Sequence, residues 1–111
     1  MIYLASPYSH PDECVRHARY IAACKATAKL TAEGKIVFSP IVHSHNLCQF
    51  ADLPADWDFW SRIDIEILSR CDEFYILPLD GWNWSKGVGA ELQYANENGK
   101  AITILDVEVY A

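Results

Sequence analysis

Residues 74–105 read FYILPLDGWNWSKGVGAELQYANENGKAITIL and contain one complete strand–helix–strand unit. The apolar run 74–77 ends at Pro78 and predicts a strand. Helical spacing of apolar residues begins near Gly87 and stops at Asn98-Gly99, and residues 101–105 predict the next strand. A helix between two such strands predicts a right-handed crossover that leaves the strands parallel.

The same alternation precedes this unit. Residues 2–5 predict a strand, residues 12–33 a long helix capped by Asp12 and ended by Gly34, and residues 36–38 a second strand. A loop is expected over residues 41–54 and another helix over residues 56–70. The stripe expected to be buried in the 12–33 helix consists of Val15, Ala18, Ile21, Ala22, Ala28 and Leu30. The chain is therefore predicted to be one α/β domain over residues 1–111, with a parallel sheet covered on both faces.

Composition narrows the classes of function. The 111 residues are 51% hydrophobic and carry a net charge of −6, which argues against a partner that is a nucleic acid polymer. No apolar run reaches membrane-spanning length and no signal peptide is recognisable, so a cytoplasmic protein is expected. The four cysteines lie far apart without a CxxC motif, and buried free thiols are the expectation. In so small a domain, a large ligand site is expected to be shared with a partner subunit.

In parallel sheets of this kind, ligands bind at the carboxyl ends of the strands. This rule selects three segments, residues 6–11, 40–54 and 79–86, before any motif is considered.

Two carboxylates occupy positions that helical spacing turns toward the interior. Asp64 lies four residues after Trp60 and four before Leu68, on or beside the apolar stripe of its helix. A buried unpaired carboxylate is costly, so Asp64 is expected to have partners or a function; the alternative is an edge position that caps a neighbouring loop. Glu91 lies three residues after Val88 and four before Ala95. The alternative for Glu91 is an exposed glutamate at a helix N-terminus, where the helix dipole favours its charge.

Such a pair suits the chemistry of glycosidic bonds. One carboxylate can attack an anomeric carbon and hold a covalent glycosyl intermediate, and negative charge stabilises the oxocarbenium-like transition state. A second acid can protonate the departing group or hold sugar hydroxyls. Glu91 and Asp64 fit these two roles, and Gly87 and Gly89 would let a ligand approach the backbone beside Glu91.

Three motifs resemble the nucleoside 2-deoxyribosyltransferase-like family, which includes nucleotide N-glycosidases. The opening Tyr3-Leu-Ala-Ser-Pro7 is similar to that family's YLAGP strand, and the segment from Asp64 to Asp72 is similar to its D-x7-D segment. The run from Ser85 to Ala95, followed by Gly99-Lys100, is similar to its S-x-G-V-x-x-E-x-G-x-A…G-K signature. The motifs extend from residue 3 to about residue 105, nearly the whole chain.

The resemblance implies a flavodoxin-like or Rossmann-like three-layer sandwich with a parallel sheet of four to five strands, and a homodimer or higher homo-oligomer. It implies that Glu91 is the catalytic nucleophile, that Asp64 assists as acid and binds the sugar, and that Tyr3 lies near the ribosyl site. Ser85 matches a serine that contacts a 5′-phosphate in the nucleotide-cleaving branch, and the neighbouring Lys86 would accept the same group. A nucleoside 5′-monophosphate is therefore the favoured substrate and water the favoured acceptor, with transfer to a second base left open. No cofactor is implied.

The chain departs from the pattern at two glycines. Ser6, followed by Pro7, replaces the usual glycine of the first loop and is expected to narrow the approach of the substrate; Gln93 replaces a glycine of the 87–98 helix. The C-terminal segment with which a neighbouring subunit completes the site in relatives has no recognisable match here.

Further residues on the expected ligand side have two interpretations each. His43 and His45 are expected to contact substrate or to make loop hydrogen bonds; a metal site is not expected, because no third ligand has standard spacing. Trp82 or Trp84 could stack on a nucleobase or could pack in an interface. Trp57 and Trp60 are expected to be core or interface anchors.

Two other functions compete with glycosidic cleavage. A non-catalytic nucleotide-binding or sensing module could use the same fold. A flavodoxin-like redox protein is disfavoured because the loop after the first strand is not rich in serine and threonine.

Overall fold

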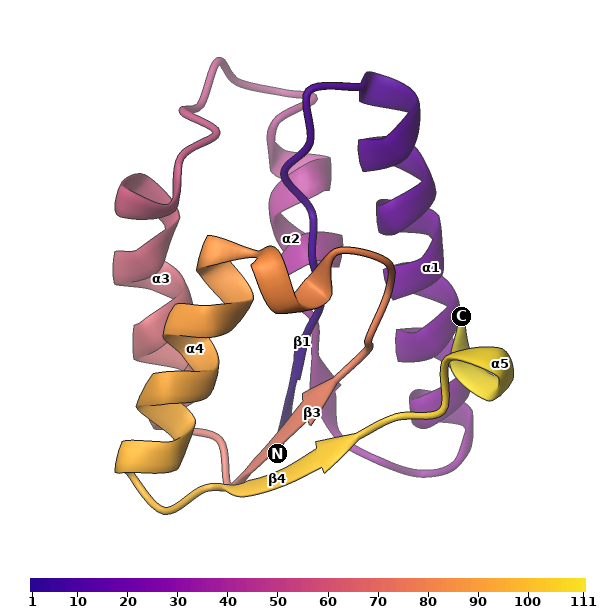
Figure 1. Cartoon of the computed structure of the whole chain (residues 1–111), viewed down its shortest axis with the longest axis vertical. Coiled ribbons are helices and arrows are strands. Elements are labelled where there is room, and N and C mark those ends of the chain that lie inside the picture. Colours follow the sequence, from indigo (N-terminus) through magenta and orange to yellow (C-terminus); the bar gives the residue numbers. More distant parts are fainter.

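The computed structural model describes residues 1–111 and contains one sheet of four parallel strands in the order β2-β1-β3-β4. Its strands are β1 (Ile2–Ala5), β2 (Val37–Phe38), β3 (Glu73–Ile76) and β4 (Ala101–Ile104). The central strands are in register from Ile2 opposite Glu73 to Ala5 opposite Ile76. The fold is a flavodoxin-like or Rossmann-like three-layer sandwich, as expected, and the sheet has four strands (Figure 1).

Helices cover both faces of the sheet. They are α1 (Glu13–Ala32), α2 (Pro40–Leu47), α3 (Trp57–Ser69), α4 (Lys86–Glu97) and the short α5 (Val107–Tyr110), with a single 3₁₀ turn, η1 (Trp82–Trp84), before α4. Figure 1 shows α3 and α4 on one side of the strands and α1 and α5 on the other. The loop after β1, the segment before α3 and η1 gather where the strands end.

Strand alternation divides the core into two clusters, because successive side chains point to opposite faces. Tyr3 and Phe74 pack with Leu68 and Val88 on the α3/α4 face. Leu4 packs with Ala26, Leu30, Leu77 and Leu105 on the α1 face.

Local signals explain where the helices begin and end. The Asp12 carboxylate accepts a hydrogen bond from Cys14 N at 2.8 Å, and the Asp56 carboxylate accepts one from Phe59 N at 2.8 Å. Gly34 follows α1 with φ of +88°, a conformation that strongly favours glycine.

Three expectations about local structure are wrong. Residues 40–47 form α2 and not a loop, because the Ser39 hydroxyl accepts from Val42 N and Pro40 fits the first helical turn. The buried stripe of α1 is Ala23, Ala26 and Leu30, which leaves Ile21 exposed.

Cysteine burial is the third correction. All four thiols are free, but Cys14 and Cys48 are exposed and only Cys71 is fully buried. Cys14 lies in the first turn of α1 and Cys48 directly follows α2, where neighbouring elements leave the side chains uncovered.

None of the helices combines the length and the apolar character that crossing a membrane requires.

Candidate active site

Glu91 lies on α4 and points into the α3/α4 side of the molecule. Its neighbours along the helix, Val88 and Ala95, are buried core residues, and Glu91 itself is only 4% exposed. The phenol of Tyr3, a fully buried residue of β1, donates a hydrogen bond to Glu91 Oε2. The interpretation of Glu91 as an exposed helix-terminal glutamate is therefore wrong.

Asp64 is the second buried carboxylate. It lies on α3 between the buried Trp60 and Leu68 and is 6% exposed. Its Oδ1 is buried and has no hydrogen-bond partner within the chain. Asp64 therefore makes no loop cap through this oxygen, and an orphaned acceptor of this kind is a candidate for binding a ligand.

The burial of these groups changes their acidity. Burial raises the pKa of Glu91 to about 8; the Tyr3 hydrogen bond acts in the opposite direction, and the charge of Asp64 adds to the increase. Burial also raises the pKa of Asp64 to about 7. The pKa of Tyr3 rises well above its ordinary value, first through burial and then through the charge of Glu91, so its phenol stays protonated. The pair of carboxyls therefore titrates around neutral pH, where a group can both accept and give up a proton.

Both carboxylates line one cavity of about 890 Å³. This volume lies in the range of small-molecule sites. The wall is built from the loop after β1, from α2, from the segment that leads into α3, and from the start of α4. These are the segments at the carboxyl ends of the strands (Figure 1).

Several other predicted site residues also lie on this wall. They are Ser6, His45, Ser85 and Gly87. Ser6 Oγ is buried without a hydrogen-bond partner, as Asp64 Oδ1 is. Ser85 caps α4, because its hydroxyl oxygen accepts from Val88 N at 3.2 Å. A Cβ added to Gly87 would lie 3.5 Å from the ring of Trp57, in ordinary contact.

Other predicted residues lie outside the cavity wall. Tyr3 lies behind Glu91, and Pro7 is buried. His43 is exposed and its ring lies 5.7 Å from that of Phe38. Lys86 and Gly89 are exposed and do not line the cavity.

The two tryptophans of η1 also lie away from the cavity. Trp82 packs against the α3/α4 core cluster, and Trp84 is 87% exposed. Trp60, by contrast, is a core residue on the wall, and its indole donates to Pro54 O at 2.8 Å.

Tyr8 and His10, in the 6–11 segment predicted to face the ligand, line the cavity. Arg16 of α1 also lines it and was not predicted; its Nη1 donates to His10 O at 2.5 Å and to Pro11 O at 3.3 Å. The guanidinium of Arg19 donates to Ser9 O and to Asp80 O and so links the loop after β1 to the loop after β3. No local sequence pattern predicts the contact of Arg19 with Asp80.

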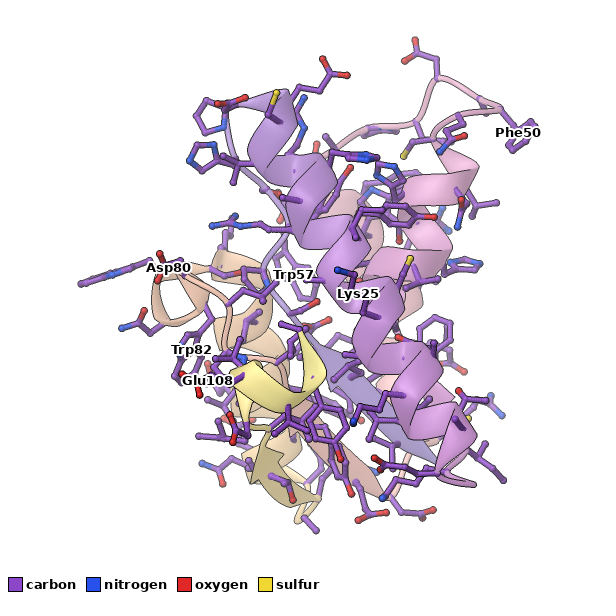
Figure 2. All side chains as sticks on the ribbon, turned by 90° about the vertical axis from the view of Figure 1, so that its right-hand side faces the viewer. Lys25, Phe50, Trp57, Asp80, Trp82 and Glu108 are labelled. Atoms are coloured by element: carbon purple, nitrogen blue, oxygen red, sulfur yellow. The ribbon has the colours of Figure 1, made fainter.

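One segment at the mouth of the cavity is open to solvent. Residues 48–56 connect α2 to α3, and their Leu53 and Ala55 line the cavity. Phe50 extends from the same segment away from the body of the molecule (Figure 2) and is 88% exposed.

No three histidine, cysteine, aspartate or glutamate side chains are placed together in a way that could hold a metal ion. The groups placed for chemistry at this site include the two buried carboxyls and the Tyr3 phenol that donates to Glu91.

Comparison with known proteins gives a family but no activity. The family model described as "Domain of unknown function (DUF1937)" matches residues 1–107. No curated protein matches the chain. Since the match covers nearly all of its residues, the chain belongs to the DUF1937 family.

Proposed function

We propose that the protein cleaves the N-glycosidic bond of a nucleoside or nucleoside 5′-monophosphate, with Glu91 as nucleophile and Asp64 as acid. The observation that carries the proposal is the pair of buried carboxyls on the wall of one cavity, one held by Tyr3 and the other with an unpartnered oxygen. The resemblance of the Tyr3, Asp64 and Ser85–Ala95 motifs to the nucleoside 2-deoxyribosyltransferase-like family supports the same roles.

The hydrogen bonds favour Asp64 as the protonated residue when one of the two carboxyls holds a proton. The Tyr3 phenol donates to Glu91 and stabilises its negative charge. Asp64 Oδ1 has no donor, so the negative charge is less well stabilised there. The pKa values of about 7 and about 8 are the two titration steps of interacting carboxyls, and because only Glu91 has a donor to its charge, we assign the proton of the singly protonated pair to Asp64, which leaves Glu91 as the carboxylate.

Reaction then proceeds in two displacements. The Glu91 carboxylate forms a bond to the anomeric carbon while the bond to the base nitrogen breaks, and the Asp64 proton moves to the departing base. The product is a glycosyl ester on Glu91 and a free base. Water then attacks the anomeric carbon, ionised Asp64 takes its proton, and Glu91 leaves as the carboxylate.

A nucleoside 5′-monophosphate is the proposed substrate and water the proposed acceptor. Ser85 lies on the wall at the start of α4, and its hydroxyl hydrogen is free to donate because its oxygen serves the cap. Lys86 is exposed and outside the wall, so the phosphate contact is assigned to Ser85. Ser85→Asp keeps a capping oxygen and adds a charge that repels phosphate.

The phosphate assignment has its own test. Ser85→Asp is expected to lower kcat/KM for monophosphates relative to free nucleosides by roughly 10-fold, on the order of one charge-assisted hydrogen bond. Lys86→Met, which changes a side chain outside the wall, is expected to leave this ratio unchanged. Equal effects of the two substitutions would remove the assignment.

The experiment that tests the function is the release of free base. The protein is incubated with a panel of deoxyribonucleosides, ribonucleosides and their 5′-monophosphates, and the base is measured by chromatography. Glu91→Gln is expected to lower release by at least about 1,000-fold, because the nucleophile is lost. Glu97→Gln, on the same helix but exposed, is the matched control and is expected to keep full activity.

Three outcomes separate the possibilities. Release that Glu91→Gln abolishes supports the proposal, and a new nucleoside formed on adding a second base makes the protein a transferase. Binding of nucleotides without any release would instead indicate the sensing module. The homodimer or higher homo-oligomer that the family resemblance implies is checked separately by light scattering of the purified protein.

A further inference from the structure

The part of the cavity wall formed by the loop after β1 and by α2, here called the outer wall, contains an aromatic cluster that the proposed chemistry does not use. His45 on α2 lies on the wall, and its ring stacks on Tyr20 of α1 with centroids 3.8 Å apart and an interplanar angle of 19°. Tyr8, in the loop after β1, meets the same ring edge-on and also lines the cavity. The imidazole is therefore held from two sides.

Hydrogen bonds fix which nitrogen of His45 remains available. Tyr8 Oη lies 2.8 Å from His45 Nδ1. Burial raises the pKa of Tyr8 and, together with the nearby His17, lowers the pKa of His45, so both groups are neutral at pH 7. The chain offers Tyr8 Oη no other acceptor, so we assign the phenol as the donor to Nδ1, which requires the imidazole proton to be on Nε2.

The Nε2–H group is the hydrogen-bonding group of His45 that the chain leaves free. Nδ1 is taken by Tyr8, one ring face by Tyr20, and no hydrogen bond within the chain involves Nε2. Tyr20 is itself anchored, because its hydroxyl donates to Asn46 Oδ1 at 3.2 Å. The ring of His45, which lines the cavity, is therefore held in one orientation with an uncharged donor before any ligand binds.

The surroundings of this donor favour a flat, uncharged ring. Pro40, Ile41 and Leu53 lie on the same cavity wall as His45, and the guanidinium of Arg16 on that wall is engaged with the carbonyls of His10 and Pro11. Apolar side chains with one neutral donor suit a heteroaromatic ring that has a carbonyl or ring-nitrogen acceptor. A phosphate would instead favour charged or multiple donors.

From this geometry we infer that His45, oriented by Tyr8 and Tyr20, is the residue that selects the leaving base, by donating from Nε2 to an acceptor atom of a purine or pyrimidine. The inference rests on the proposed function and assigns the outer part of the same cavity. The base lies between this donor and the carboxyl pair, of which Glu91 attacks the sugar and Asp64 gives its proton to the base. His45 determines which base binds and takes no part in the displacement.

The first test measures binding without catalysis. Glu91→Gln protein is titrated by calorimetry with adenine, guanine, hypoxanthine, cytosine and uracil. At least one base is expected to bind, and His45→Phe, which keeps an aromatic ring but loses the donor, is expected to weaken the preferred base by about 10-fold, or 1.4 kcal/mol. His45→Gln, which keeps an N–H donor, is expected to lose less.

Matched variants separate the donor from packing. Tyr8→Phe keeps the ring and frees the tautomer of His45, and is expected to reduce the discrimination between bases while the protein stays folded by circular dichroism. His43→Phe changes the exposed histidine of the same helix outside the cavity wall and is expected to change no base affinity. Equal base affinities in the His45→Phe protein and its parent, or no binding of any base, would overturn the inference.

The second test uses the active protein. The ratio of kcat/KM for each monophosphate to that for its nucleoside is expected to stay within about twofold in His45→Phe, while the order of preferred bases changes. A changed phosphate ratio with an unchanged base order would assign His45 to the phosphate and overturn the inference. Base binding that depends on His45, without base release by the unaltered protein, would reject the proposed function alone.

Discussion

Acidic side chains are exposed to solvent at the amino end of the sheet and buried at its carboxyl end. At the amino end, Asp72 precedes β3, is fully solvated, and pairs with the N-terminal ammonium of Met1 at 3.0 Å. That contact lowers the pKa of Asp72. At the carboxyl end, Asp64 and Glu91 are buried, and burial raises their pKa values to about 7 and about 8.

The difference separates a surface contact from a site. Asp72 gains from its partner and can be solvated without it, so its loss is cheap. Asp64 and Glu91 are buried, so water solvates their charges poorly. Their ionisation therefore lowers the free energy of unfolding. Two buried carboxyls on one cavity wall indicate a functional site. The following predictions test this difference between the two ends of the sheet.

After the loss of Glu91 itself, the largest effect on catalysis is expected from Asp64. Asp64→Asn keeps the shape of the side chain but has no proton to give, and is expected to lower kcat by roughly 100-fold or more, as general acids contribute on that scale. Steady-state kinetics on the substrate identified by base release checks this. Asp72→Asn, at the other end of the sheet, is the control and is expected to retain full activity.

The pH profile of the same protein carries a second part of this prediction. For the unaltered protein, kcat/KM is expected to rise as Glu91 ionises and to fall as Asp64 loses its proton, giving a bell with limbs near pH 7 and 8 that belong to the pair. Asp64→Asn is expected to remove the alkaline limb. An alkaline limb that persists in this variant would exclude Asp64 as the acid.

The substitutions that lower activity, Glu91→Gln and Asp64→Asn, are expected to raise the stability of the folded protein. Because the folded pKa values of Asp64 and Glu91 lie above their unfolded values, the contribution of these two groups to stability is highest below about pH 4 and falls as the pH rises to about 8. Glu91→Gln and Asp64→Asn should each stabilise the protein at pH 8 by about 2–4 kcal/mol, and the gain should vanish near pH 4. Urea unfolding at the two pH values measures this.

The outcome that breaks the comparison is a loss of stability at pH 8 in both amide variants. It would mean that the carboxylates are paired in the folded protein in a way that their burial does not reveal.

Tyr3 is expected to have a smaller effect. Tyr3→Phe removes the donor to Glu91 without changing the packing against Phe74, whose ring is stacked on Tyr3 at 5.9 Å. We expect kcat/KM to fall by roughly 10-fold, the scale of one hydrogen bond to a charged group, and the acid limb to move to higher pH because the Glu91 charge loses its donor. An unchanged acid limb would show that Tyr3 has only a structural role.

The smallest effect is expected at the amino end. Asp72→Asn removes an exposed ion pair, which solvent screens, and its thermal midpoint at pH 7 should match that of the unaltered protein within error. Since the pKa of Asp72 is lowered, any contribution of the pair exists above the unfolded pKa and is lost as the pH falls. A clear drop in midpoint would show that the sheet ends differ less than their burial indicates.

Helix periodicity predicted the part of the site that lies on regular elements. Spacing against Val88, Ala95, Trp60 and Leu68 was enough to turn Glu91 and Asp64 inward, because a helical face follows directly from the order of residues. The parallel sheet followed from the alternation of strands and helices in the same way.

The outer wall could not be predicted so directly. The Ser39-Pro40 pair is typical of the start of a helix. It predicts α2, on which His43 and His45 are two residues apart and therefore point to different sides of the helix. The contact between Tyr8 and His45 joins segments far apart in sequence and depends on tertiary packing alone. Ser85 was predicted on the ligand side, but its capping of α4 defines its orientation only in the folded chain.

The most direct test of the account is to trap the glycosyl ester. Candidate nucleotides that carry fluorine at the 2′ position slow the second displacement, because the electronegative substituent destabilises the oxocarbenium-like transition state. Intact mass and peptide mapping after incubation are expected to show one added sugar moiety on Glu91, absent in Glu91→Gln. Base release that leaves Glu91 unmodified, or a sugar carried by Asp64 instead, would contradict the assignment of the nucleophile.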